Sequence, residues 1–316
     1  MLDSPKHGVS KRGLESTYCQ VYSLATKTGI LAVVFMEDHE PVRKAKLREN
    51  LDGLLNAFQR YLTSEPICEL RSNSPHHDFP HFALNMPLGH ARGSRGFQSA
   101  VERGALLSNN ELKRLGARPT NPSQNISVEV RLGTADYVFT FAGPLRYAGI
   151  CGFLFDAGIE KIRSGDAIAT PFDSGGLIDH FRPNDTDEQR VKFLQDHELS
   201  VPEYRGYFEL VLATLFDSPW NYVDGTVPDR FGPIAFYGGD SRRWTFEVRF
   251  LNELLLESGL VAVFLPVGIA STELLQEQLI KWDKIGVDII IYVAQTDGQG
   301  RDLLEESVKY IKSYLG

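Results

Sequence analysis

Two apolar runs near the end of the chain, VAVFLPV at residues 261–267 and VDIIIYVA at residues 287–294, decide the fold class. Both runs are rich in β-branched residues, which is typical of buried strands. Residues 272–285 between them and residues 301–315 after them are predicted helices. Two buried strands joined by a helix predict a parallel, right-handed unit. We therefore expect a mixed α/β protein with a central mixed sheet and flanking helices.

Further strands and helices are predicted upstream of this unit. The aromatic, β-branched run YVFTFA at residues 137–142 is the strongest strand signal. Residues 126–132 alternate between apolar and polar side chains, which also predicts a strand. Shorter strands are expected at residues 152–155 and 167–170, and helices at residues 107–115, 185–197 and 204–216.

The first part of the chain is less regular. Strand candidates at residues 18–25 and 29–36 precede a predicted helix at residues 42–62, so the chain is expected to begin with a strand–helix unit. Residues 63–125 contain six prolines and are predicted to be mostly loop, with a boundary at PTNPSQ, residues 119–124. The predicted division is an N-terminal region, residues 1–125, and a catalytic α/β domain, residues 126–316.

Composition excludes several classes of protein. Hydrophobic residues make up 42% of the 316 residues, enough to build a sizeable core. The longest apolar runs have eight or nine residues, whereas a membrane span needs about 20, and no secretory leader is visible, so a cytoplasmic protein without membrane contact is expected. The three cysteines are scattered without CxxC spacing, which argues against a disulfide framework and a zinc knuckle. The net charge of −8 confines any nucleic-acid contact to a local patch.

The stretch RWTFEVRF, residues 243–250, carries the most informative carboxylate. Strict alternation places its apolar side chains on one face and Glu247 and Arg249 on the other. A long glycine- and proline-rich loop precedes it, and a carboxylate on a rigid strand beside a loop can orient a sugar hydroxyl. The alternative is an edge strand with a solvent-exposed Glu–Arg pair.

A second candidate is IATPFDSGGL, residues 168–177. A strand runs into a loop with paired glycines, whose N–H groups can hold phosphate, and Phe172 can stack on a planar ring. The lysine and the spacing of a Walker loop are missing. The alternative is a tight turn that needs glycine at positive φ.

A histidine cluster is the third candidate. His76, His77, Asp78 and His81 lie close enough in sequence to be metal ligands, although HExxH is absent and a surface or capping role is the alternative. They define a second function, a metal-dependent hydrolase or nuclease. A third is a non-enzymatic interaction module of a toxin–antitoxin or defence complex. GxSxG, GxGxxG and GK[ST] motifs do not occur.

The order of elements in residues 126–316 resembles that of bacterial ADP-ribosyltransferase toxins, including the DarT-like enzymes that modify nucleic acids. A strand is followed by a phosphate-compatible loop, then helices, a long loop and a strand with an outward glutamate. The resemblance implies an ADP-ribosyltransferase-like core in the C-terminal two-thirds of the chain. It also implies NAD as substrate, release of nicotinamide, and no metal.

The resemblance implies roles for individual residues. Glu247 would be catalytic, Tyr137 and Phe172 would stack on nicotinamide, and Arg146 or His180 would grip NAD. Arg230, Arg242 and Arg243 beside the loop would hold phosphate of a macromolecular acceptor, either RNA or DNA. An antitoxin or a chaperone is the expected protein partner. The full set of NAD-binding candidates is Tyr137, Arg146, Thr170, Phe172, Asp173, Ser174 and Gly175.

Overall fold

The computed structural model contains two compact units, Met1–Ala45 and Lys46–Gly316. These units differ from the predicted division at residues 125 and 126. The residues that the structure describes are 20–26, 29–35, 53, 56, 79–117, 124–147, 149–158, 167–178, 182–216, 218–225, 246–270, 273–294 and 300–316.

The first unit contains a β-hairpin. Strand β1 (Gln20–Thr26) pairs antiparallel with β2 (Gly29–Phe35), and Thr26 lies opposite Gly29. Both predicted strands are thus confirmed, but the chain begins with a strand–strand unit. Gly53 and Asn56 are helical, and the rest of the helix predicted at residues 42–62 lies outside the described residues.

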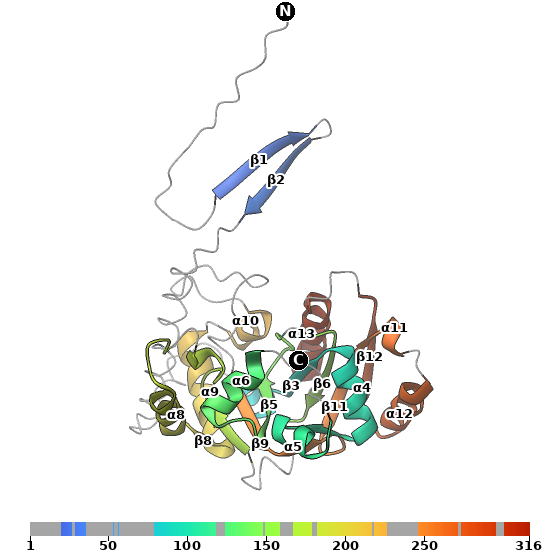
Figure 1. The fold of residues 1–316 in the computed structure, drawn as a ribbon. Helices are drawn as coiled ribbons and strands as arrows, with labels where there is room; N and C mark the ends of the chain where they lie inside the picture. The colour runs from blue at the N-terminus through green and yellow to red at the C-terminus, as the bar shows by residue number, and fades with distance from the viewer. Residues whose placement is uncertain are drawn as a thin grey trace, which may run out of the picture. The chain divides into compact units, whose positions relative to one another are not determined.

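The second unit is built on an eight-stranded sheet with the order β12-β11-β6-β3-β5-β9-β7-β8 (Figure 1). The pair β11–β12 is parallel and the other neighbours are antiparallel, so the predicted mixed sheet is confirmed. The strands are β3 (Leu88–Arg92), β5 (Tyr137–Ala142), β6 (Cys151–Phe155), β7 (Ala167–Thr170), β8 (Leu199–Ser200), β9 (Glu247–Leu251), β11 (Leu260–Pro266) and β12 (Asp288–Tyr292). Strands β4 (Ala105–Leu107) and β10 (Glu253–Leu255) form a separate antiparallel pair.

Helices cover both faces of the sheet. Phe97 of α4 stacks on Phe153, whereas Tyr310 of α13 contacts Phe264. Phe153 pairs with Val263, so Phe153 and Phe264 point to opposite faces. None of the described helices is long and apolar enough to cross a membrane. The helices are α3 (Phe79–Asn85), α4 (Ser94–Arg103), α5 (Asn109–Arg114), α6 (Gln124–Leu132), α8 (Asp187–Asp196), α9 (Val201–Leu215), α10 (Pro219–Asp224), α11 (Val267–Ala270), α12 (Glu273–Lys284) and α13 (Arg301–Leu315).

The C-terminal unit that decided the fold class is confirmed. Strands β11 and β12 are parallel and α12 lies between them in the chain. Helix α13 has the predicted bounds, because its apolar positions Leu304, Ile311 and Leu315 recur on one buried face.

The prediction that residues 63–125 are mostly loop is wrong for the second half of that stretch. Strand β3, LGHAR, lies in the middle of the sheet between β5 and β6. It has no β-branched residue, so local propensity gave no signal. A Cβ on Gly89 would lie 2.9 Å from Leu145 Cδ2 and 3.0 Å from the carbonyl oxygen of Gly143, so close packing requires the glycine.

The strand predicted at residues 126–132 is also wrong, because this segment is helix α6. Leu132 is buried and Val130 is 57% exposed, although an alternating strand would place both on one face. Alternation over seven residues is too short to separate a strand from a helix.

Aromatic packing fixes the position of β9. Phe246 precedes the strand and is fully buried against Tyr204 and Phe208 of α9, with ring centroids 6.1 and 4.5 Å away. Val248 and Phe250 on the same face are also fully buried. The face of β9 that carries Glu247 and Arg249 is therefore backed by a tightly packed core.

Candidate active site

Glu247 lies at the start of an internal strand. It is opposite Phe141 of β5 on one side and Thr170 of β7 on the other. The alternative of an edge strand with a solvent-exposed pair is therefore wrong: Glu247 is 0% and Arg249 is 1% exposed. The predicted alternation is confirmed, since Val248 lies between them in the core on the other face.

Four groups surround the Glu247 carboxylate. The backbone N–H of Ser174 and its hydroxyl donate to Oε2 at 3.2 and 3.1 Å. The hydroxyl of Thr170 lies 3.4 Å from Oε1, and Nε of Arg249 lies 3.3 Å from the same oxygen. Both carboxylate oxygens are thus oriented by the protein.

The environment of Glu247 perturbs its ionisation. Burial is the main cause that raises the pKa of Glu247 to about 8, and the nearby charge of Asp173 contributes to this rise. The charge of Arg249 and the hydrogen bonds from Ser174 oppose this rise in the pKa. A buried carboxyl whose pKa lies close to neutral is typical of groups that take part in chemistry.

The loop after β7 holds Glu247 through its own backbone. The N–H of Gly175 donates to Asp173 Oδ1 at 2.8 Å, and that of Gly176 donates to the carbonyl oxygen of Asp173 at 3.1 Å. Together with Ser174, three successive N–H groups therefore donate within the protein, and their predicted contact with phosphate stays a prediction. The alternative of a tight turn is confirmed by the i→i+3 hydrogen bond from Gly176 to Asp173, but neither glycine has positive φ, so the expected need for positive φ is wrong.

Phe172 and the aromatic pair beside Glu247 have different surroundings. The Phe172 ring is fully buried in a cluster with Leu177 and Leu194. By contrast, Phe141 and Tyr147 are half-buried and stack at 4.2 Å with an interplanar angle of 22°. This pair was not among the predicted site residues, and Phe141 lies directly opposite Glu247 in the strand register.

Tyr147 ties this pair to the loop. Its hydroxyl donates to Asp173 Oδ2 at 2.8 Å, and Asp173 is adjacent to Ser174. The predicted residues Thr170, Asp173 and Ser174 are therefore brought together around Glu247. A signal existed in the sequence, because alternation in YVFTFA places Phe141 on the face opposite Thr140.

Tyr137 lies at the other end of β5, opposite Leu251. Its ring centroid is 5.2 Å from the guanidinium carbon of Arg249. Tyr137 is thus linked to Glu247 through Arg249.

Arg146 is directed toward the end of α10. Its Nη2 donates to the carbonyl oxygens of Tyr222 and Val223, the latter at 3.1 Å. Burial lowers the pKa of Arg146. A cation at a helix C-terminus is electrostatically favourable, so the geometry gives Arg146 a structural role, and its grip on NAD stays a prediction. His180, Arg230, Arg242 and Arg243 lie outside the described residues.

The predicted metal cluster is only partly described. His81 is exposed on α3, 3.1 Å from the side-chain amide of Asn85, and His76, His77 and Asp78 lie outside the described residues. Within the described ranges, no group of three or more His, Cys, Asp or Glu residues could hold a metal ion. Burial raises the pKa of the Cys151 thiol to about 12, which makes it unreactive.

A second polar cluster lies on β3. His90 Nδ1 is 2.6 Å from the carbonyl oxygen of Phe139, and Nε of Arg92 donates to His90 Nε2 at 2.7 Å. Burial lowers the pKa of His90 to about 3, so this ring is neutral at physiological pH. Gly89 shares the face of Phe141 and Glu247 through the strand register, so the adjacent His90 points away from Glu247.

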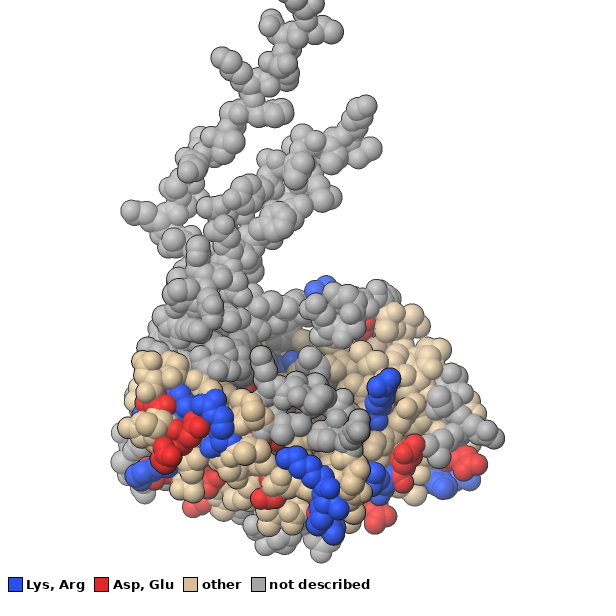
Figure 2. Space-filling model, viewed as in Figure 1, with Lys and Arg blue, Asp and Glu red and all other residues tan. Residues whose placement is uncertain are grey.

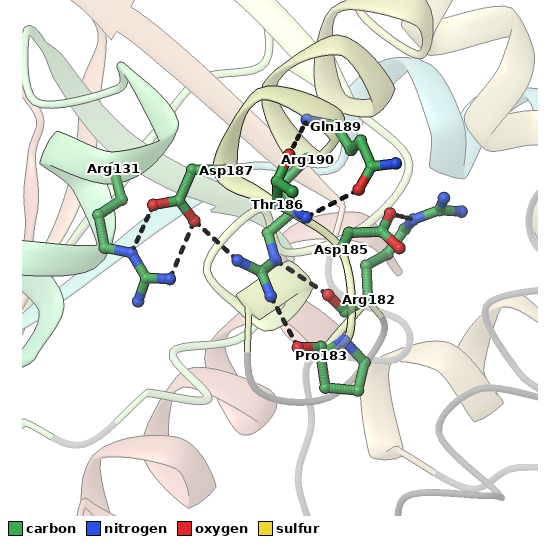
Figure 3. A network of polar contacts seen from close by, with 8 residues as sticks. All are labelled: Arg131, Arg182, Pro183, Asp185, Thr186, Asp187, Gln189 and Arg190. Atoms are coloured by element: carbon green, nitrogen blue, oxygen red, sulfur yellow. Dashed lines mark hydrogen bonds and ion pairs between the residues drawn. The ribbon is translucent and has the colours of Figure 1, made fainter.

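An arginine–aspartate network fixes α8 beside the site (Figure 3). Asp187 accepts from Arg131 of α6 at 2.9 Å and from Arg190 at 2.7 Å. Arg190 also donates to the carbonyl oxygens of Arg182 and Pro183, both at 2.9 Å. The network joins α6, α8 and the segment before α8.

Charged side chains are mixed on the face shown in Figure 2. Lysines and arginines there alternate with aspartates and glutamates over the described surface. The described part of this face therefore carries no broad basic patch.

Comparison with known proteins finds matches among solved structures. No protein-family model and no curated protein matches the chain. Three solved structures of Thermus sp. 2.9 DarT match 66% of it: with ADP-ribosylated ssDNA (12% identity, 94% of that chain, TM-score 0.36), with NAD+ (12%, 95%, 0.35) and with carba-NAD+ (9%, 96%, 0.33). A likeness at this level assigns no substrate to this chain, so the chemistry of Glu247 and its neighbours has to do so.

Proposed function

We propose that this chain is an ADP-ribosyltransferase that uses NAD as its substrate and Glu247 as its catalytic residue. The environment of Glu247 carries the proposal. Its carboxylate is fully buried on an internal strand and is oriented by Ser174 and Arg249. A buried, oriented carboxylate with a pKa near neutral is costly to maintain, which is expected where the group is used.

The aromatic pair supplies the second part of an NAD site. The stacked rings of Phe141 and Tyr147 are half-buried, so one aromatic surface is partly open beside Glu247. Nicotinamide is a planar ring, and offset stacking on aromatic side chains is favourable. Phe141 lies opposite Glu247 on the neighbouring strand, so a ring bound there would lie on the face of the sheet that carries the carboxylate.

The reaction follows from this placement. The bond between the nicotinamide nitrogen and ribose C1′ breaks, and nicotinamide leaves with the bonding electron pair. A lone pair of the acceptor forms the new bond to C1′, and the acceptor proton passes to a base or to water. Ionised Glu247 accepts a hydrogen bond from the ribose 2′-hydroxyl and stabilises the positive charge that develops on the ribose.

The acceptor is proposed to be a macromolecule, with RNA or DNA as the predicted class. Arg230, Arg242 and Arg243 keep their predicted role as phosphate contacts. The proposed NAD contacts of Tyr137 and Arg146 and the antitoxin or chaperone partner are also kept as predictions. Incubation of the protein with adenylate-labelled NAD and separate protein, DNA and RNA pools identifies the class that takes up label.

Release of labelled nicotinamide tests the catalytic role of Glu247. We expect Glu247→Gln to lower the release rate by about 10²–10³, because one electrostatic contact to the transition state is lost. The matched control is Glu111→Gln, which removes the charge of a half-buried carboxylate paired with Arg114 on α5 and should keep the wild-type rate. NAD should also raise the melting temperature of the wild type. Wild-type release by Glu247→Gln would refute the assignment, as would a wild type that neither binds nor cleaves millimolar NAD.

A further inference from the structure

Arg249 is buried on the same strand face as Glu247, two residues further along β9. Its Nε lies 3.3 Å from Glu247 Oε1, and its Nη2 donates to Glu198 Oε1 at 2.7 Å. Its guanidinium carbon lies 5.2 Å from the centroid of the Tyr137 ring. Glu247, Glu198 and the Tyr137 ring therefore flank the guanidinium, which is hydrogen-bonded to Glu198 and in ion-pair contact with Glu247, to which Nε makes no hydrogen bond.

Burial of an arginine at this position carries a large desolvation penalty. Removal of a guanidinium from water is strongly unfavourable unless its partners compensate. An aliphatic side chain could occupy this buried strand position without that desolvation penalty, as Val248 does on the other face. The arginine is therefore explained by the groups that it contacts rather than by the sheet.

Glu198 accepts the hydrogen bond from the outer end of the Arg249 guanidinium. It follows α8 in the chain, and its side chain is 27% exposed, so it carries its charge partly in water. The network around Asp187 and Arg190 fixes the other end of the same helix (Figure 3). Glu198 thus provides a fixed anchor for the outer end of the Arg249 guanidinium.

We infer that Arg249, anchored by Glu198, is a positioning residue that orients the Glu247 carboxylate and favours its ionised form in catalysis. The inference rests on the proposed function of Glu247. Its geometric basis is that Arg249 touches the carboxylate on the strand that carries it, and is itself held by a residue from a different helix end.

The charged and polar groups that face Glu247 agree with this role. Asp173 from the loop after β7 disfavours the charged carboxylate, and Tyr147 from the segment after β5 donates to Asp173. Thr170 and Ser174 contribute neutral hydroxyls. Among these described groups, Arg249 supplies the positive charge that favours ionisation.

The pH profile of nicotinamide release tests the inference. In wild type the rate should rise with pH as Glu247 ionises. We expect Arg249→Met to move this rise to higher pH by about one unit or more, and to lower the rate at neutral pH about tenfold with little change in KM. Arg249→Lys, which keeps a cation, should recover part of both effects. An unmoved profile in Arg249→Met would overturn the inference.

A folding measurement separates this inference from the proposed function. The free energy of unfolding is measured against pH, without NAD, for four proteins: wild type, Glu247→Gln, Arg249→Met and the double variant. In each background, the difference between the proteins with Glu247 and with Gln at this position gives the pKa of Glu247. We expect the higher pKa in the Arg249→Met background. A wild type without nicotinamide release defeats only the proposed function, whereas an equal pKa in both backgrounds defeats this inference.

Glu198 provides a test at the rim if Arg249→Met does not fold. Glu198→Ala should lower kcat because Arg249 loses its anchor, and Glu198→Gln, which keeps an acceptor oxygen, should retain more activity. The control is Asp196→Asn, which removes an exposed partner of Lys192 and should keep the wild-type rate and pH profile. A wild-type rate and profile in Glu198→Ala would count against the anchoring role.

Discussion

Two charge clusters of this molecule have opposite arrangements: one has an arginine between two carboxylates, and the other has an aspartate between two arginines. In the inner centre, Arg249 lies between the carboxylates of Glu247 and Glu198. In the outer centre, Asp187 lies between the guanidinium groups of Arg131 and Arg190. Burial raises the pKa of Glu247 to about 8, whereas the hydrogen bond from Arg131 lowers the pKa of Asp187.

Access to water accounts for the difference. The side chains of Glu247 and Arg249 are 0% and 1% exposed, whereas those of Asp187 and Arg131 are 36% and 44% exposed. In the inner centre the loss of hydration exceeds the attraction of the partner, whereas in the outer centre Asp187 and Arg131 keep part of their hydration. A similar set of charges therefore gives a reactive group in one place and a structural clamp in the other.

The largest expected effect concerns the pH dependence of stability at the inner centre. Because burial raises the pKa of Glu247 from 4.5 to about 8, the folded protein keeps a proton that the unfolded chain releases. Wild-type stability should thus fall as pH rises through this interval, and Glu247→Gln should gain relative to wild type by at most on the order of 5 kcal/mol. Urea unfolding across this range measures the gain, and parallel curves for the two proteins would contradict a buried Glu247.

The second effect concerns Phe172, which connects the loop around Glu247 to α8. Its ring centroid lies 5.8 Å from that of Phe193, over which Arg182 lies. Phe172→Ala should lower the free energy of unfolding by about 3–5 kcal/mol, because it leaves a cavity in a fully buried cluster. The half-buried Phe141 is the matched control, and Phe141→Ala should cost less stability and raise KM for NAD. The reverse pattern would assign ring stacking to Phe172, as the sequence predicts.

The third effect tests the outer centre through its buried member. Arg190 is 4% exposed and donates to two carbonyl oxygens as well as to Asp187. Arg190→Met should lower the free energy of unfolding by about 2 kcal/mol, since buried acceptors lose a charged donor. Thermal unfolding measures the change, with the exposed Lys192→Met as control. Equal stability of both variants would show that the clamp does not hold α8.

The smallest effect is expected for Asp187→Asn. Asparagine keeps an acceptor oxygen, and the lost charge is partly screened by water. The lowered pKa of Asp187 means that its contribution is present above its unfolded pKa and disappears as pH falls through the folded value. The destabilisation should therefore shrink in acid and in high salt. A destabilisation that is insensitive to salt would show that the charge of Asp187 is shielded from water, as the charges of Glu247 and Arg249 are.

The fold was predictable where local pattern and environment agree. Strand β7 and helix α13 have the predicted bounds because β-branched residues and helical periodicity mark them. Strand β3 was missed because its neighbours, rather than its own residues, make it a strand. Helix α6 was assigned to the wrong class because its alternation is too short to outweigh tertiary packing.

The candidate site was predictable only where the local sequence pattern determines the position of a residue. Alternation placed Glu247 and Arg249 on one face, but it could not show that a strand on each side buries them. Ser174 was found through its glycine-rich loop. Tyr147 and Glu198 were missed because their contacts, with Asp173 and Arg249, join segments 26 and 51 residues apart in the chain.

The pH dependence of nicotinamide release by the wild-type protein, with Glu247→Gln alongside, tests the account most directly. The account predicts a rate that rises with pH to a plateau, with an apparent pKa near the value of about 8 for Glu247, and no such rise in the variant. A rate that is independent of pH over this range, or a variant that follows the wild-type curve, would contradict it.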